Sequence, residues 1–300
     1  MRDFRIEAPT ADVAAEAFSP VFIIGAHRSG TSALYRLLAE TGAFAYFTAA
    51  DIVALNAARH GRAEEAALAE LARVCGTLST RLIDSMRITP DFPEEYGFLL
   101  AGRRLTQENV GAFRAACAHV VARRGLRRVL LKNPWDIDQL DFIRKSFPNA
   151  RFVAIHRHPA DIVASQRNAM KTLILDGSPY HDLIDPRSGT GRVPLAGRLL
   201  LRVPGAMSIF AAVLMVRLRL RLTRMMVELA TLDPRDLIEI RFEDLAADQA
   251  MVLGKVHAFL GLDHPPATRG FKAGRNHGQN RFRSKVARAF LGDYARRHGY

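Results

Sequence analysis

The stretch FIIGAHRSGTSALYRLLAETG, residues 22–42, decides the expected fold. Its continuous apolar start predicts a buried strand, and its later leucines have the spacing of a helix. Between them lies a turn bounded by Gly25 and Gly30, with the glycine spacing of a nucleotide-triphosphate loop. However, Thr31 occupies the position of the loop lysine, and Arg28 lies inside the loop instead. The stretch therefore predicts a phosphate-binding loop whose positive charge comes from an unusual position.

The residues of this loop suit an oxyanion. A turn that ends in Gly30 can point backbone N–H groups inward, and a helix that starts near Thr31 adds its N-terminal amides. Arg28 supplies a planar charged fork, and hydroxyl donors come from Ser29, Thr31 and Ser32. The simpler alternative is a strand-to-helix turn capped by a hydroxyl. Because one short turn holds two glycines, an arginine and three hydroxyls, we favour phosphate binding.

Strands and helices are expected to alternate along the chain. Further buried strands are expected within 127–134, 150–159 and 237–245, with helices between them, including one over 93–105. This alternation predicts an α/β fold with a P-loop-type central parallel sheet and helices on both faces. We expect one domain over 1–300, with 1–19 as a loosely ordered arm and about 176–230 as a helical insertion on the acceptor side.

Composition limits the classes of function. Apolar residues make up 49% of the 300 residues and charged residues 24%, which is typical of a soluble globular chain. The formal charge of +13 predicts an anionic partner, although a GC-rich source would also raise the arginine count. Cys75 and Cys117 form no disulfide framework, and we expect a cytoplasmic location.

The ends of two expected strands carry no carboxylate. One ends in Lys132 and Asn133, and the other in His156 and Arg157. A kinase or GTPase needs a loop lysine and an aspartate there to hold Mg²⁺. We therefore expect no metal, and a kinase-like phosphotransferase is the less favoured alternative.

With both strand ends in view, the chain resembles the sulfotransferases that use 3′-phosphoadenosine 5′-phosphosulfate (PAPS). The resemblance rests on RSGTS at 28–32 and on RHPADIVAS at 157–165, in that order. The stretch LLKNPWDIDQLDFIRKSFPNARFVAIHRHP, 130–159, is similar to the bacterial and tyrosylprotein-type branch. The resemblance covers about 20–170, with a weaker echo at 240–248 and 259–262.

The resemblance implies PAPS as co-substrate and transfer of its sulfuryl group to a hydroxyl or amine of an acceptor. Residues 28–32 would grip the 5′-phosphosulfate, while Arg157 and Ser165 would hold the 3′-phosphate. Ser165 lies two turns into the helix after Arg157, where it faces back toward the strand end. Lys132 matches a Lys-x-Pro element of the tyrosylprotein-type branch, so it would stabilise charge in the transition state together with Arg28.

The general base is less clear, because the family uses a histidine in some branches and a glutamate in others. Glu94 and Glu95 stand at the start of an expected helix, where capping is the simpler role. Adjacent acids face different directions, and we favour Glu95 over Glu94. Asp51 lies nearer in sequence to the glutamate of the tyrosylprotein-type branch. His27 and His156 are weaker candidates.

The acceptor side is the least defined part of the sequence. Segment 201–229 combines an apolar centre with an alternating Arg–Leu run, and we expect one long helix. It is either a core helix with snorkelling arginines or a surface for anionic lipid or an apolar acceptor. A small-molecule or lipid-like acceptor is expected and nucleic acid is not, because the informative cations lie at strand ends. A non-catalytic anion- or membrane-binding protein is the second alternative. A basic stretch at 272–285 could close over the nucleotide or be a solvated loop.

Overall fold

The computed structural model describes residues 18–78, 80–81, 86–187, 206–262 and 291–300. The expected N-terminal arm up to residue 17, part of the expected insertion (188–205) and the basic stretch 272–285 lie outside the described residues.

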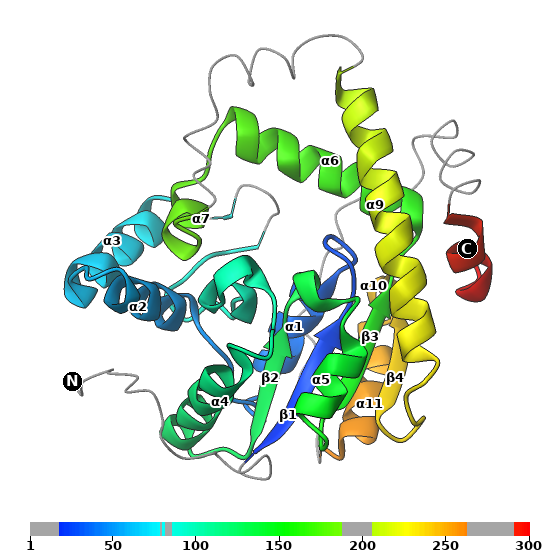
Figure 1. Ribbon diagram of the computed structural model, residues 1–300, viewed down its shortest axis with the longest axis horizontal. Helices are drawn as coiled ribbons and strands as arrows, with labels where there is room; N and C mark the ends of the chain where they lie inside the picture. The colour runs from blue at the N-terminus through cyan, green and yellow to red at the C-terminus, as the bar shows by residue number, and fades with distance from the viewer. Residues whose placement is uncertain (1–17, 79, 82–85, 188–205, 263–290) are drawn as a thin grey trace.

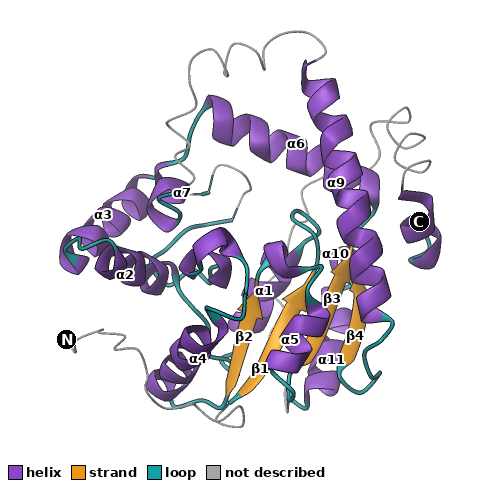
Figure 2. Ribbon diagram, viewed as in Figure 1, coloured by secondary structure: helices purple, strands orange, loops and turns teal. Residues whose placement is uncertain are grey.

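Within these described ranges, four parallel strands form the central sheet (Figure 2). They are β1 (Ser19–Ile24), β2 (Arg128–Lys132), β3 (Arg151–His156) and β4 (Leu237–Arg241), in the order β2-β1-β3-β4. Each falls where its apolar run predicts a strand. The register pairs Ile23 with Lys132 and His156 with Arg241, so the strand ends that carry the candidate site residues meet at one edge of the sheet.

Helices surround this sheet (Figure 1). The α-helices are α1 (Thr31–Ala39), α2 (Ala49–Arg59), α3 (Glu64–Thr77), α4 (Val110–Arg124), α5 (Leu140–Ser146), α6 (Pro159–Leu175), α7 (Pro179–Ile184), α9 (Ala206–Leu229), α10 (Phe242–Ala247) and α11 (Gln249–Leu260). Short 3₁₀ helices are η1 (Tyr96–Leu99), η2 (Ala101–Arg103) and η3 (Pro134–Asp136).

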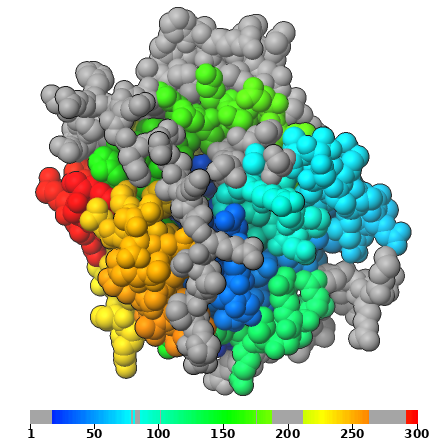
Figure 3. Space-filling view, turned by 180° about the vertical axis from the view of Figure 1, so that it is seen from behind, coloured from blue at the N-terminus to red at the C-terminus, as the bar shows by residue number. Residues whose placement is uncertain are grey.

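Alternate side chains of the strands enter two separate apolar cores. On β1, Val21 and Ile23 pack with α1 and α11, whereas Phe22 and Ile24 pack with α4, α5 and α9. Figure 3 shows the first of these faces, with α1 in blue and α11 in orange, and Figure 1 shows α5 and α9 on the other. The two-residue period of a strand produces this division. The expected fold, a parallel sheet with helices on both faces, is confirmed.

The expected helix over 93–105 is wrong. This stretch forms η1 and η2, which are joined by an extended residue at Leu100. Gly102 adopts a φ of +69° inside the second turn, which no α-helix tolerates in its interior. Glu94 and Glu95 therefore precede a 3₁₀ turn rather than open an α-helix. Of the long helix expected over 201–229, residues 206–229 are present as α9, and residues 201–205 lie outside the described residues.

The first prediction concerns Gly30, which caps α1 with a φ of +101°. A Cβ built there lies 2.2 Å from the Cδ2 atom of Phe242. We expect Gly30→Ala to lower the free energy of unfolding by about 2–4 kcal/mol, measured by urea denaturation, because it adds a clash to the conformational strain. Gly42→Ala is the control: its φ is +73° but its Cβ would meet nothing within 4 Å, so about 1 kcal/mol is expected. Equal losses in the two variants would contradict this account.

Candidate active site

The loop between β1 and α1 closes on itself through Ser29. Both the amide and the hydroxyl of Ser29 donate to the carbonyl oxygen of Ala26, at 3.0 and 2.8 Å. Arg28 takes a positive φ of 71°, which is uncommon for a residue other than glycine. Gly30 offers α1 no side-chain cap. Within the described part of the chain, the first amides of α1, at Thr31 and Ser32, therefore have neither an intrahelical acceptor nor a side-chain cap from Gly30, as in anion-binding helix starts.

The two phosphate motifs expected from the sequence lie side by side. Arg28 donates from Nε to the hydroxyl oxygen of Ser165 at 3.0 Å, across 137 residues of sequence. Arg157 donates from Nη1 to the carbonyl oxygen of Arg28 at 2.9 Å. Gln166 donates to the carbonyl oxygen of His27 at 2.8 Å, which fixes α6 against the loop.

Arg157 is held by packing but keeps an unmatched donor. Its guanidinium carbon lies 4.5 Å from the ring centre of Phe242, the same ring that Gly30 contacts. Burial lowers the pKa of Arg157, although Asp161 and Glu243 act to raise it. Its Nε is buried and has no hydrogen-bond partner among the residues that the structure describes. A buried donor without an acceptor is costly, and an oxyanion at this point would satisfy it.

A second cluster lies at the end of β2. The Lys132 ammonium lies 2.7 Å from Oε1 of Glu95 and donates to the hydroxyl oxygen of Ser32 at 2.7 Å. The side chains of Lys132 and Glu95 are only 1% and 11% exposed. Burial alone would raise the pKa of Glu95, but the charge of Lys132 and its contact with the carboxylate outweigh burial, and the pKa falls below its usual value of 4.5. Glu95 is therefore ionised at neutral pH.

Glu94 turns away from this cluster. Its Oε1 accepts a hydrogen bond from the Tyr180 hydroxyl at 2.8 Å and lies 3.7 Å from the buried Arg81 guanidinium. Burial raises its pKa, against the opposing charges of Arg81 and Lys132. Of the two adjacent glutamates, Glu95 is the one that contacts Lys132.

Asp51 lies in a different set of contacts. It forms a capping box with Thr48 at the start of α2, and its other oxygen lies 2.7 Å from the Arg123 guanidinium. Both oxygens are thus used: one caps the start of α2 and the other holds α2 to α4. We do not retain Asp51 as a candidate base.

His27 lies among the charged groups of the site. Its ring meets Trp135 edge-on, with centroids 4.7 Å apart. The pKa of His27 falls to about 4, mainly because of burial; Arg221, Lys132 and Arg28 also lower it, while Glu95 acts to raise it. His27 is therefore neutral at pH 7.

His156 is buried within a separate cluster. Its Nε2 lies 2.8 Å from Glu239, its Nδ1 lies 3.1 Å from the Tyr294 hydroxyl, and its ring stacks on His298 at 3.6 Å. His156, Glu239 and His298 have the composition of a metal site. The two rings, however, are nearly parallel at 18°, so a shared ion would lie out of both ring planes. Hydrogen bonding and stacking account for this cluster, and we assign no ion to it.

Two C-terminal tyrosines hold the backbone around Arg157 in place. The Tyr294 hydroxyl accepts a hydrogen bond from the Arg157 amide at 3.4 Å. Tyr300 donates to Glu243 at 2.7 Å, and Glu243 accepts from the His158 amide at 2.9 Å. Nothing in the local sequence connects these tyrosines to a strand end 137 residues earlier, so sequence analysis missed them.

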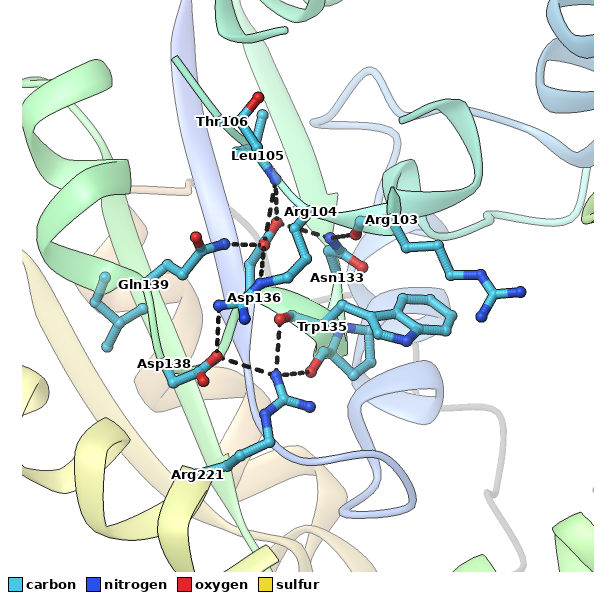
Figure 4. Close-up of polar contacts among 12 residues, drawn as sticks. Arg103, Arg104, Leu105, Thr106, Asn133, Trp135, Asp136, Asp138, Gln139 and Arg221 are labelled. Carbon is cyan, nitrogen blue, oxygen red and sulfur yellow. Dashed lines mark hydrogen bonds and ion pairs between the residues drawn. The ribbon is translucent and has the colours of Figure 1, made fainter. Parts of the chain in front are cut away.

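A buried aspartate organises the turn after Lys132 (Figure 4). Asp136 accepts hydrogen bonds from the Tyr96 hydroxyl, the Asn133 amide, the Gln139 side chain and the Leu105 backbone. Nearby, Arg221 of α9 donates to the carbonyl oxygens of Pro134 and Trp135 and to Asp138. The turn that carries Asn133 is thus held by both the 93–105 stretch and α9.

Comparison with known proteins identifies the class. The sequence profile of the sulfotransferase family matches residues 20–189, more than half of the chain. The chain therefore belongs to the sulfotransferase family and is an enzyme of this type.

Two solved structures share the fold. One is sulfotransferase STF1 from Mycobacterium tuberculosis H37Rv, with a TM-score of 0.58, 15% identity, and coverage of 92% of this chain and 77% of that chain. The other is sulfotransferase STF9 from Mycobacterium avium, with a TM-score of 0.57, 16% identity, and coverage of 94% and 77%. A search of curated proteins found no match. Among the helices that the structure describes, none combines the length and apolar character needed to cross a bilayer.

The second prediction concerns the pH dependence that Asp136 confers. Burial raises its pKa from 3.8 to about 6, although hydrogen bonds from Tyr96 and Asn133 act to lower it. Folding then takes up a proton between these values, so this group's contribution to stability falls as the pH rises from 3.8 to about 6. Asp136→Asn cannot titrate. We expect its deficit in unfolding free energy relative to wild type to shrink by roughly 2–3 kcal/mol across that window.

Urea titrations at several pH values test this. Asp141→Asn on α5 is the control, because a hydrogen bond from Lys145 lowers the pKa of Asp141 and so gives the opposite direction of change. A deficit for Asp136→Asn that stays constant with pH would contradict the assignment.

Proposed function

We propose that this sulfotransferase transfers the sulfuryl group of PAPS to a hydroxyl or amine of a small-molecule or lipid-like acceptor. The observation that carries the proposal is the contact between the two anion-binding elements, in which Arg157 donates to the backbone of Arg28. A ligand with phosphates at both its 5′ and 3′ positions needs two such elements at one strand edge. No metal is required, because cationic side chains supply the charge.

The residues present fit this ligand. The uncapped start of α1, with Thr31 and Ser32, would receive the 5′-phosphosulfate. The unmatched Nε of Arg157 suits a 3′-phosphate oxygen. Arg28 and Ser165 would exchange their mutual hydrogen bond for bonds to the nucleotide. A Cβ at Gly25 would lie 2.7 Å from the Ser29 hydroxyl oxygen, so glycine is needed for the loop to close.

Glu95 and Lys132 are the proposed reacting pair. The Glu95 carboxylate would take the proton of the acceptor hydroxyl or amine. The acceptor oxygen or nitrogen forms a bond to sulfur as the bond from sulfur to the 5′-phosphate oxygen breaks, and adenosine 3′,5′-bisphosphate leaves with that electron pair. Lys132 and Arg28 would stabilise the charge on the sulfuryl oxygens and the leaving phosphate. In the structure Lys132 contacts Glu95 and Ser32, so it lies between the proposed base and the loop.

The kinase-like phosphotransferase receives less support. β2 ends in Lys132 and β3 in His156, and neither supplies the carboxylate that would hold Mg²⁺. The family match also favours sulfuryl transfer over the non-catalytic alternative.

The third prediction tests the nucleotide site. Adenosine 3′,5′-bisphosphate should raise the melting temperature of the wild type, whereas Mg-ATP should not. Arg157→Ala should weaken binding of the bisphosphate by roughly 10- to 100-fold in calorimetry, because it removes charge-assisted hydrogen bonds to the 3′-phosphate. The variant should also no longer prefer the bisphosphate over adenosine 5′-monophosphate. Arg151→Ala, at the other end of β3, is the matched control. Unchanged affinity in Arg157→Ala would place the 3′-phosphate elsewhere, and no response of the wild type would defeat the proposal.

The fourth prediction separates the two glutamates. With an acceptor from a PAPS-coupled screen, Glu95→Gln should lower kcat by about 10²- to 10⁴-fold. Glu94→Gln should act mainly on stability, since Glu94 pairs with Tyr180 and Arg81. Because the pKa of Glu95 is lowered, the base is ionised above 4.5, and wild-type kcat should decline with this group only below that pH. If Glu95→Gln keeps a normal kcat while His27→Asn is inactive, the general base is His27 rather than Glu95.

A further inference from the structure

Helix α9 carries an exposed apolar stripe. Val213, Val216, Leu220 and Val227 are 51%, 47%, 67% and 62% exposed. In the part of the chain that the structure describes, Met251 is the one other large apolar residue of comparable exposure. The spacings of three, four and seven residues put the four side chains on one face of the helix. We call these four residues the α9 stripe.

The stripe is not the result of a loosely attached helix. The opposite face of α9 packs into the core through Leu218, Leu222, Met225 and Leu229, each no more than 5% exposed. Arg221 fastens the same face to the turn after β2. One side of α9 is therefore buried in the core, whereas the exposed side with the α9 stripe has no partner within the described chain.

Arginines border the stripe on both sides. Helical geometry places Arg217 and Arg224 along one edge and Arg219 along the other, and all three are exposed. Between residues 212 and 229 the sequence has a single acid, Glu228, whose carboxylate already accepts from the Leu140 amide and the Arg224 guanidinium. The exposed face is thus apolar at its centre and positively charged at its rims.

We propose that the α9 stripe and its bordering arginines bind an anionic lipid surface. Apolar side chains between arginines have the pattern of a helix that lies in the bilayer interface, with the arginine stems extending to the headgroups. A second copy of this chain fits less well, because like-charged rims would face one another. The N-terminal half of α9, which includes Val213 and Val216, extends past the carboxyl edge of the sheet (Figure 1). This inference does not depend on the proposed reaction.

Co-sedimentation of the full chain with lipid vesicles tests the proposal. Vesicles that contain phosphatidylglycerol should bind the wild type, phosphatidylcholine vesicles should not, and rising salt should weaken binding. Leu220→Glu should reduce binding at least about tenfold, because it places a carboxylate where an apolar side chain enters the lipid. Arg217→Ala and Arg219→Ala should each reduce it about fivefold.

Matched controls separate the stripe from net charge. Met251→Glu on α11 makes the same change of charge at an exposed apolar residue, and Arg62→Ala removes an exposed arginine beyond α2; both should bind vesicles as the wild type does. Unchanged melting temperatures would show that the variants fold. Absence of binding to phosphatidylglycerol vesicles, or equal losses in the controls, would overturn the proposal. The proposal would also be overturned if the wild type does not bind vesicles but is a dimer in light scattering, and Leu220→Glu makes it a monomer.

Discussion

The buried ammonium of Lys132 is the constraint around which the candidate site is arranged. At 1% exposure, this charge would be very costly without partners. Its partners come from two other segments: Glu95 from the stretch before η1 and Ser32 from the first turn of α1. The three segments must therefore meet at one point of the sheet edge. The Glu95 carboxylate neutralises the ammonium and the Ser32 hydroxyl accepts one of its hydrogen bonds, so the start of α1 is brought to the same point as Lys132 and Glu95.

The turn after Lys132 extends this constraint outward. Asp136 satisfies four donors, and two of them, Tyr96 and Leu105, belong to the stretch that also presents Glu95. These bonds hold the stretch that carries Glu95 beside the end of β2, in addition to the direct ion pair of Glu95 with Lys132. The β2 side of the candidate site is thus held by buried hydrogen bonds. On the β3 side, Phe242 packs against Gly30 and Arg157, and Arg157 and Gln166 donate hydrogen bonds to the loop.

The sequence predicted those elements whose structure depends on neighbouring residues. The strands follow from apolar runs, and the loop follows from its glycines. The prediction failed for 93–105, because Glu94 and Glu95 are positioned by Tyr180 and Lys132, which are distant in sequence, and because Gly102 takes a positive φ. The role of Asp51 could not be foreseen either, since its partner Arg123 lies 72 residues away. The placement of Tyr294 and Tyr300 behind Arg157 depends likewise on tertiary packing alone.

The alternating Arg–Leu run of α9 shows how one helix serves two surfaces. A period of two along a helix turns each successive arginine by about 200°, so Arg219 and Arg221 face nearly opposite ways. Arg221 consequently holds the turn after β2, while Arg219 borders the exposed stripe. The helix that would lie on a lipid surface is therefore the one that braces the turn next to Lys132. A displacement of α9 by a lipid surface would therefore move that turn first, because Arg221 bonds α9 directly to the carbonyl oxygens of Pro134 and Trp135.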